Sequence, residues 1–369
     1  MTDCDVLAVG AGPAGCATAI RTARGGLSTV LLDRPRAARS WAGESLPPGI
    51  DNVVRSLFGE GILSETHHPP AIGTRSVWGS DALVETDFLT NPLGGGWLLD
   101  RARFDAAARE AAAAAGVAIV EVRHLGRLSR GPSAWRLDIG DGTRLSARFL
   151  VDATGRSGAL LRRLGVGRIA ADRQVAILAT SPDDGDAYCG TTVEAVPEGW
   201  WYTTPLPGGR RVLAYLTDED LWRQGARDWS ALLKETLHVG RCAGRNALSA
   251  RPGAYPAGTA QADRVAGDNW LAVGDAAASF DPLSSQGLAS AILMGARAGD
   301  AVAHPDRGGA IGVWAEAYAM LVAEHADLRT HYARLEKRWP SSVFWRRRQE
   351  PDDAVTKPRL GWQSSMSLP

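Results

Sequence analysis

The hydrophobic pattern of the chain begins with a short apolar run, Val6 to Val9, which predicts a buried parallel strand. This run leads directly into glycines at positions 10, 12 and 15, after which a helix is expected. A second apolar run, Thr29 to Leu32, predicts another strand and ends at Asp33. Strand, glycine turn, helix and strand in this order predict a βαβ unit at the start of the chain.

The glycine turn Gly10-x-Gly12-x-x-Gly15 predicts a dinucleotide site. The first glycine permits a tight turn, the second allows backbone to approach a pyrophosphate, and the third allows the helix to pack on the strand. The start of the helix would then present free N–H groups to the phosphates. Asp33 lies near the offset of about 20 residues that is expected for a ribose-binding acid. The alternative is a glycine-rich turn in an ordinary α/β unit.

Further along the chain, the pattern predicts a second sheet and several helices. Alternating or strand-like segments lie at 75–79, 82–88, 117–122, 134–139, 146–151 and 174–217. Helices are expected at 49–61, 100–115, 218–238 and 311–337, with another ending near 303. Beyond residue 339 the pattern shows no clear periodicity, and we expect a tail there.

Composition narrows the possible partners. The 369 residues carry a formal net charge of zero, which favours neither a nucleic acid nor an anionic membrane as partner. No stretch approaches the ~18 apolar residues of a membrane span. The four cysteines are scattered without a CxxC pair, so neither a disulfide framework nor a metal site is expected. Because the glycine turn follows Met1 so closely, no signal peptide is expected, and we predict a cytoplasmic protein.

Two later turns extend the first one into a recognisable set. Asp152-Ala-Thr-Gly155 ends one predicted strand, and Gly274-Asp275 ends another. Together with Arg101 in Asp-Arg-x-x-Phe-Asp, they resemble the motifs of FAD monooxygenases of the p-hydroxybenzoate hydroxylase type. The resemblance implies FAD as cofactor. The cofactor-binding residues that it implies, together with the neighbouring loops, are Gly10, Gly12, Pro13, Ala14, Gly15, Asp33, Arg34, Ser45, Arg101, Asp152, Gly155, Gly274, Asp275, Pro282, Ser285, Gly287 and Leu288.

Two loops point further within this superfamily. The loop Phe280-Asp-Pro-Leu-Ser-Ser-Gln-Gly287 and the turn Gly43-Glu-Ser45 resemble those of flavin-dependent tryptophan halogenases. The halogenase motif W-x-W-x-I-P is incomplete, because Tyr202 and Thr204 replace its second tryptophan and its isoleucine. Halogenases also need a lysine between flavin and substrate, and this chain has none before Lys234. The chain therefore most resembles the related flavoproteins that hydroxylate tryptophan in a peptide or protein, such as tryptophylquinone maturation enzymes.

This resemblance implies an α/β fold. It consists of a discontinuous Rossmann-like FAD-binding domain (1–70, 97–172 and 262–303), an inserted antiparallel β-sheet substrate domain (71–96 and 173–261), and a C-terminal helical segment and tail (304–369).

The implied reaction is hydroxylation of an indole through a flavin C4a-hydroperoxide, with O2 as co-substrate. No second GxGxxG is evident, so either NAD(P)H binds fleetingly or a separate flavin reductase supplies the electrons. The candidates for catalysis are Glu44, His67, Asp281 and Gln286. The candidates for an aromatic substrate pocket are Trp78, Trp97, Trp200, Trp201 and Tyr202, and the arginines at 346–348 could contact a peptide carrier.

Three alternatives stay open from the sequence. The first is a halogenase-like enzyme acting on a small molecule. The second is a prenyl-chain reductase of the geranylgeranyl reductase type, which shares the fold and would need a long apolar tunnel. The third is a flavin-stabilised protein that binds a partner polypeptide without catalysis.

Overall fold

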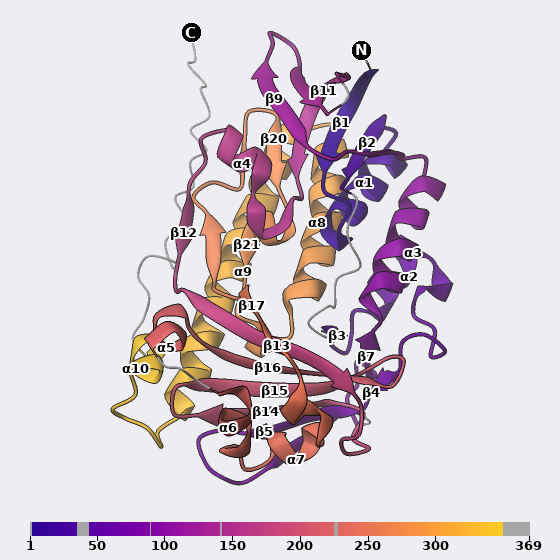
Figure 1. Cartoon of the computed structure of the whole chain (residues 1–369). Helices are drawn as coiled ribbons and strands as arrows, with labels where there is room; N and C mark the ends of the chain where they lie inside the picture. Colours follow the sequence, from indigo (N-terminus) through magenta and orange to yellow (C-terminus); the bar gives the residue numbers. More distant parts are fainter. Residues whose placement is uncertain (1, 35–43, 89, 141, 225–227, 350–369) are drawn as a thin grey trace.

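The computed structural model describes residues 2–34, 44–88, 90–140, 142–224 and 228–349, except for the side chains of residues 2 and 44. A sheet of eight strands forms one end of the molecule, with the order β19-β20-β11-β1-β2-β8 and with β10 and β9 continuing from β11 (Figure 1). Its inner pairs are parallel. The strands are β1 (Thr2–Val9), β2 (Thr29–Asp33), β8 (Ala118–Glu121), β9 (Leu125–Arg130), β10 (Trp135–Ile139), β11 (Arg144–Asp152), β19 (Ala266–Gly267) and β20 (Trp270–Ala272).

The helices packed against this sheet meet at small residues. They are α1 (Pro13–Arg24), α3 (Arg101–Ala114), α8 (Gly287–Ala303) and the long α9 (Arg307–Leu335). Helices α1 and α8 approach so closely that Thr18 Oγ1 donates to the backbone oxygen of Gly295 at 2.8 Å. A Cβ atom at Gly295 would lie 2.6 Å from the Ala14 oxygen. This contact brings the first helix and the C-terminal part of the chain into one core.

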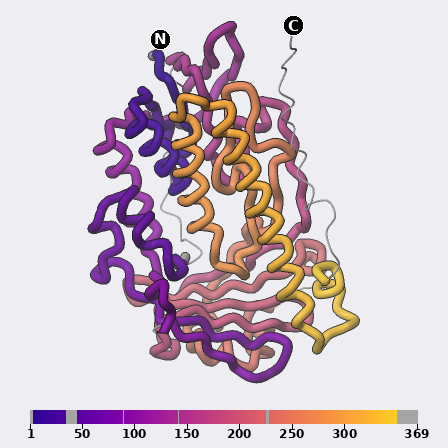
Figure 2. Tube along the Cα trace, turned by 180° about the vertical axis from the view of Figure 1, so that it is seen from behind, coloured from indigo at the N-terminus to yellow at the C-terminus, as the bar shows by residue number. Residues whose placement is uncertain are grey.

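A second sheet of seven strands lies across the other end of the molecule, in the order β17-β13-β16-β15-β14-β5-β6 (Figures 1 and 2). We expected it to be antiparallel, but β14 and β5 pair in parallel. The reason is that no hairpin joins these two strands, since the chain passes through the first sheet between them. The strands are β5 (Gly73–Val77), β6 (Val84–Asp87), β13 (Gln174–Pro182), β14 (Thr191–Val196), β15 (Gly199–Leu206), β16 (Arg210–Asp218) and β17 (Gly253–Pro256).

The second sheet is covered on both faces. One face packs on α6 (Trp229–Lys234) and α7 (Val239–Ala243), and the other packs on the end of α9 and on α10 (Val343–Gln349). The predicted helix at 218–238 is wrong in extent, because two shorter helices, α5 (Glu219–Gln224) and α6, are found in this range. The expected tail beyond residue 339 is also wrong, because α10 forms there and buries Phe344 and Trp345.

Short elements connect the two sheets. Two of them are the helices α2 (Asp51–Phe58) and α4 (Ala159–Arg163). One three-stranded sheet consists of β3 (Glu44–Leu46), β7 (Gly96–Leu99) and β4 (Pro70–Ala71). A second consists of β12 (Arg168–Ala170), β18 (Ala260–Ala262) and β21 (Ala278–Ser279). The 3-10 turns are η1 (Glu60–Ile62), η2 (Gly155–Ser157), η3 (Asn246–Ser249), η4 (Gly274–Ala276) and η5 (Pro282–Ser284). Within the described part of the chain, no helix is both long and apolar enough to cross a membrane. The domain boundaries given above stay a prediction.

Candidate active site

A cavity of about 770 Å³ lies between the two sheets. Its wall is formed by the ends of β1 and β2, the turns that follow β11 and β20, the start of α8, and one face of β14 and β15. The cavity thus lies at the carboxyl ends of the parallel strands, where open α/β sheets place their ligands. Of the seventeen predicted cofactor-binding residues, all except Asp152 line it.

The first glycine turn fits closely against the turn after β11. Gly10 has φ +110°, and a Cβ atom there would overlap the backbone oxygen of Ala153. A Cβ atom at Gly15 would overlap the oxygen of Gly10. Helix α1 begins at Pro13, and no described side chain caps it at Gly12. The turn from Gly10 to Gly15, called the glycine cradle below, can therefore form only with glycine at positions 10 and 15. Its backbone N–H groups are left for an anion at the cavity wall.

Asp33 ends β2 and lines the cavity. Its Oδ2 atom lies 3.5 Å from Arg109 Nε, whereas its buried Oδ1 atom has no hydrogen-bond partner among the residues that the structure describes. An unpartnered carboxylate oxygen is an acceptor ready for a hydroxyl donor. The position thus fits a ribose hydroxyl, as the sequence predicted.

Asp152 has a different place from the one expected. Its Oδ2 atom accepts hydrogen bonds from the backbone N–H groups of Leu160 and Leu161, at 2.9 and 2.8 Å. Its Oδ1 atom accepts from the Thr154 N–H at 2.9 Å. The carboxylate is consumed by the turn that it builds, so it does not face the cavity. Thr154 and Gly155 line the cavity instead.

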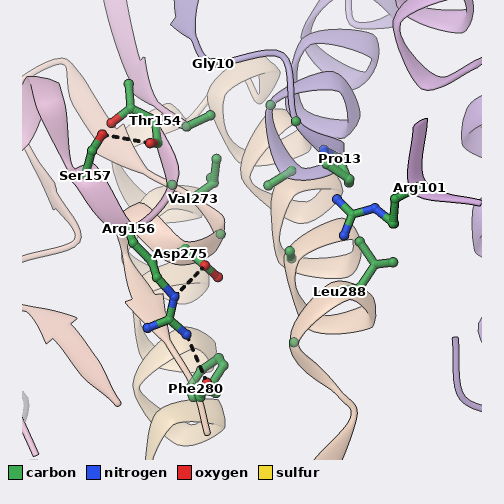
Figure 3. A pocket seen from close by; sticks show the side chains of 18 of the residues that line it. Gly10, Pro13, Arg101, Thr154, Arg156, Ser157, Val273, Asp275, Phe280 and Leu288 are labelled. Carbon is green, nitrogen blue, oxygen red and sulfur yellow. Dashed lines mark hydrogen bonds and ion pairs between the residues drawn. The ribbon is translucent and has the colours of Figure 1, made fainter. Parts of the chain in front are cut away.

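The turn after β20 presents Asp275 to the cavity beside an arginine that the sequence analysis missed. Asp275 Oδ2 lies 3.4 Å from Arg156 Nε. Arg156 also donates to the backbone oxygens of Gly258 and Phe280, at 2.6 and 3.3 Å, so Figure 3 shows it bridging this side of the cavity. Its position directly after Gly155 was the available signal, because the residue next to a ligand-binding turn faces the same space.

On the opposite side of the cavity, Arg101 opens α3 and lies near Pro13 and Leu288 (Figure 3). It is 7% exposed, and its guanidinium donates to Asp105 Oδ1 at 3.1 Å. This internal pair holds the arginine against the cavity wall. Ser45 of β3 also lines the cavity.

The loop before α8 supplies Asp281, Pro282, Ser285 and Gly287 to the wall. The carboxylate of Asp281 accepts from the Leu283 N–H at 2.9 Å and from Gln174 Nε2 at 3.1 Å. The residue Asp281 as a whole is partly exposed, but its carboxyl is surrounded by protein. This desolvation raises the pKa of the carboxyl above the ordinary aspartate value. Gln286, predicted as catalytic, is not among the residues that line the cavity.

Strand β15 contributes an aromatic wall, but only with alternate residues. Trp200 and Tyr202 line the cavity, and their ring centroids are 6.0 Å apart. Trp201 points to the other face of the sheet, where it stacks on Tyr215 at 4.9 Å. The prediction that Trp201 lines a substrate pocket is therefore wrong, because side chains alternate along a strand. Thr191, Val193 and Thr204 complete the wall and were missed.

Two other predicted pocket tryptophans do not line the cavity. The indole N–H of Trp78 donates to the Tyr332 oxygen at 2.7 Å, and its ring packs against Trp345. The Trp97 indole donates to Asp51 Oδ2 at 2.8 Å. Both rings are partly buried in structural contacts between segments, so both predictions are corrected.

The predicted catalytic histidine, His67, and its neighbour His68 lie outside the cavity wall. His67 is exposed on a loop and does not line the cavity. His68 is buried, its Nδ1 atom accepts from the Asp100 N–H at 3.1 Å, and burial lowers its pKa. The side chain of Glu44 lies outside the described residues. A histidine that the sequence analysis missed, His325, stacks on Phe280 at 3.9 Å behind the cavity wall.

Comparison with known proteins identifies the family to which this architecture belongs. The tryptophan halogenase family model matches residues 80–354, which is well over half of the chain. The chain belongs to the tryptophan halogenase family. This membership agrees with the resemblance drawn from the Phe280–Gly287 loop.

LodB of Marinomonas mediterranea, described as an FAD-dependent oxidoreductase, is 28% identical to this chain over 368 residues, covering 94% of this chain and 97% of LodB. The peptidyl tryptophan dihydroxylase QhpG, essential for tryptophylquinone cofactor biogenesis, has a TM-score of 0.75 and 26% identity, covering 95% of this chain and 80% of QhpG. The myxobacterial chondrochloren halogenase CndH has a TM-score of 0.80 at 20% identity, covering 94% and 86%, which shows a shared fold. Together with the family, these relatives show that this chain is an FAD-dependent oxidoreductase.

Proposed function

We propose that this protein is an FAD-dependent monooxygenase that hydroxylates an indole ring, borne by a tryptophan in a peptide or protein. The observation that carries this proposal is the shared cavity. It joins a glycine cradle and an unpartnered Asp33 oxygen at one end to an aromatic wall at the other. A redox cofactor and an aromatic ring could therefore meet in one partly enclosed space.

The residues present fit FAD. The N–H groups at the start of α1 would hold its pyrophosphate, Asp33 would accept from a ribose hydroxyl, and Asp275 would accept from its ribitol chain. When bound and reduced, FAD supplies the activation of O2. The electrons would come from NAD(P)H or a separate flavin reductase, since the sequence has no second glycine fingerprint.

The protein's own contribution would be orientation and proton transfer. Trp200 and Tyr202 offer flat faces on which an indole could stack, in the same cavity as the start of α8. A ring carbon that gains oxygen must lose its hydrogen as a proton before aromaticity returns. Asp281 is the carboxyl at this wall, and its raised pKa brings it closer to the range of a useful proton acceptor at neutral pH.

The similarity to QhpG supports a substrate carried by a polypeptide, because QhpG acts on a peptidyl tryptophan. Its identity of 26% extends over nearly the whole of this chain. The alignment covers 95% of this chain, so it includes the residues of both sheets.

A halogenase is the second candidate, and membership in the family favours it. The lysine that halogenases place between flavin and substrate has no counterpart, because the three lysines are at 234, 337 and 357. Arg75 is a poor substitute for it. Arg75 is held by Glu85 and Asp186, each at 2.9 Å, over the ring of Tyr188, and it does not line the cavity.

One assay separates these functions. The protein, with FAD, a reductant and O2, is offered free tryptophan, a tryptophan-containing peptide from its genomic neighbourhood, or a phenol, each with and without bromide. We expect substrate-dependent flavin reoxidation and a gain of one oxygen atom or more with the peptide alone, and no halogen isotope pattern by mass spectrometry. Brominated product would favour the halogenase. Turnover of the phenol alone, or of free tryptophan as readily as the peptide, would exclude the peptide-indole substrate.

The ribitol contact gives a separate prediction. Replacing Asp275 by alanine removes a charge-assisted acceptor worth roughly 1.5–3 kcal/mol, which raises the FAD dissociation constant about tenfold or more. Equilibrium titration of the apoprotein with FAD, followed by flavin fluorescence, measures this. Asp268→Ala serves as the control, because Asp268 pairs with Arg130 at the surface. Equal FAD affinity in both variants would remove Asp275 from the cofactor site.

A further inference from the structure

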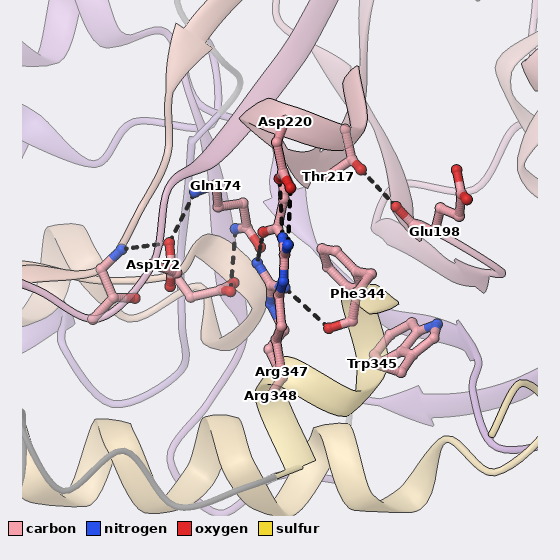
Figure 4. A network of polar contacts seen from close by, with 12 residues as sticks. Asp172, Gln174, Glu198, Thr217, Asp220, Phe344, Trp345, Arg347 and Arg348 are labelled. Carbon is pink, nitrogen blue, oxygen red and sulfur yellow. Dashed lines mark hydrogen bonds and ion pairs between the residues drawn. The ribbon is translucent and has the colours of Figure 1, made fainter. Parts of the chain in front are cut away.

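A line of buried polar side chains connects the C-terminal helix to the cavity wall. Arg348 of α10 donates from Nη2 to Gln174 Oε1 at 3.0 Å, and Gln174 donates from Nε2 to Asp281 Oδ2 at 3.1 Å. Figure 4 shows the side chain of Arg348 reaching toward Gln174. Arg348 is anchored by Asp218, with a distance of 2.6 Å between Nη2 and Oδ1. Gln174 and Arg348 are only 2% and 4% exposed, so solvent does not compete for these contacts.

The order of donors and acceptors along this line has one consequence. A guanidinium can only donate, so the end of the Gln174 amide that faces Arg348 must be its oxygen. The NH2 end of the same amide must then face Asp281, where it donates to the carboxylate. Arg348 therefore determines which end of the glutamine meets Asp281, although it makes no direct hydrogen bond to Asp281 among the contacts described.

We propose that Gln174, with its amide oriented by Arg348, is a positioning residue that holds the Asp281 carboxyl at the cavity wall in its proton-accepting form. This role deepens the proposed function, on which the use of Asp281 as proton acceptor rests. The positioning itself is a property of the protein before any cofactor or substrate binds.

The position of Asp281 explains why a dedicated donor is needed. Asp281, Phe280 and Leu283 form the partition between the large cavity and a second cavity of about 310 Å³ against α9. Desolvation there favours the neutral acid, and the nearby Asp172 adds to this effect. The Leu283 N–H and the Gln174 amide oppose it by donating to the charged form.

The other charged and titratable groups around Asp281 come from α9, from α10, from the segment before β13 and from the turn after β11. Arg329 of α9 forms an ion pair with Asp172 at 3.0 Å, and both Arg329 and Arg348 favour the ionised Asp281. His325 of α9 lies behind Phe280, and burial lowers its pKa so that it stays neutral. Arg156, after β11, donates to the Phe280 oxygen. Among the described contacts, none of these groups makes a side-chain hydrogen bond to the Asp281 carboxyl, whereas Gln174 does.

The test measures Asp281 in the protein without FAD or substrate. Infrared spectra are recorded as a function of pH, and the protonated-carboxyl band of Asp281 is assigned by its loss in Asp281→Asn. In Gln174→Leu the carboxylate loses its donor, so we expect the titration midpoint to rise by about one pH unit or more, a tenfold gain in proton affinity. Gln174→Asn, whose shorter amide cannot reach both partners, should shift it in the same direction.

Arg347→Gln is the matched control. Arg347 lies next to Arg348 on α10 and also pairs with Asp218, at 2.8 Å, but no hydrogen bond between it and Gln174 is among the described contacts. We expect its titration midpoint to equal that of the wild type. Unchanged midpoints in both Gln174 variants, with folding verified by near-UV circular dichroism, would overturn the proposal, and so would an equal shift in Arg347→Gln.

Turnover then separates the positioning from the catalytic role. If Asp281 accepts the proton, the pH profile of flavin-dependent turnover should move upward with the infrared midpoint in Gln174→Leu. A shifted midpoint with an unshifted turnover profile would support the positioning and contradict the use of Asp281 in the proposed reaction.

Discussion

Gly10→Ala is expected to abolish FAD binding. A Cβ atom at residue 10 would overlap the Ala153 backbone oxygen, and the φ of +110° is one that alanine rarely adopts. Neither backbone segment can shift without disturbing a hydrogen bond to its neighbouring strand. The Ala153 N–H donates to the Val9 oxygen at 2.9 Å, and the Gly10 N–H donates to the Leu32 oxygen at 2.8 Å. The substitution therefore forces apart two turns that line the cavity. Reconstitution with excess FAD and gel filtration should leave the variant without flavin absorbance.

Gly26→Ala separates backbone strain from the close approach. Gly26 has φ +85°, but a Cβ atom there would meet nothing within 4 Å. Both variants carry the cost of a positive φ, and Gly10→Ala alone disrupts the cradle. We expect Gly26→Ala to bind FAD like the wild type, with a modest loss of stability. Stoichiometric flavin in Gly10→Ala would show that the cradle tolerates displacement, and would contradict its assignment as the pyrophosphate site.

The second large effect is expected on stability. Trp201→Ala should lower the free energy of unfolding by about 3–5 kcal/mol, the range for removing a large aromatic side chain from a core. The Trp201 ring is 1% exposed and packs between Tyr215 and Trp229, with centroids 4.9 Å away in each case. These contacts join the second sheet to α6. Urea denaturation followed by circular dichroism measures the loss.

Tyr202→Ala provides the comparison on the next residue of the same strand. Tyr202 lines the cavity and is only partly buried, so we expect a smaller loss of stability but a large loss of turnover with the peptide substrate. A Trp201→Ala variant that stays as stable as the wild type, or a Tyr202→Ala variant with full turnover, would contradict the assignment of the two faces of β15.

The first βαβ unit could be predicted almost residue by residue. Its strands are buried on both faces and its glycines follow the first strand at a fixed spacing, so the unit leaves a clear trace in the order of residues. Only the structure shows that the backbone close to Gly10 belongs to Ala153, in the turn after β11. Asp33, Gly274 and Asp275 follow strands whose ends converge at one edge of a parallel sheet, so their approach to one cavity was also predictable.

The tryptophans were harder to assign, because an aromatic residue suits a core and a pocket equally well. The alternation of β15 would have separated Trp201 from Trp200 and Tyr202 once the strand was aligned. No such local rule places Trp78 and Trp97, whose partners Tyr332 and Asp51 come from other segments. The arginines at 346–348 show the same difficulty. Their place near the C-terminus suggests peptide contacts, but Arg347 pairs with Asp218 and Asp220 and Arg348 is buried.

The sequence by itself determined the class of fold, the glycine cradle and the family, because these depend on short motifs that can be recognised in the order of residues. The tertiary structure alone decided which aromatic side chains face the cavity, that Arg156 lies beside Asp275, and that α10 connects to Asp281 through Gln174. These contacts join residues more than a hundred positions apart. They depend on how two sheets and a C-terminal helix pack together, which no local pattern encodes.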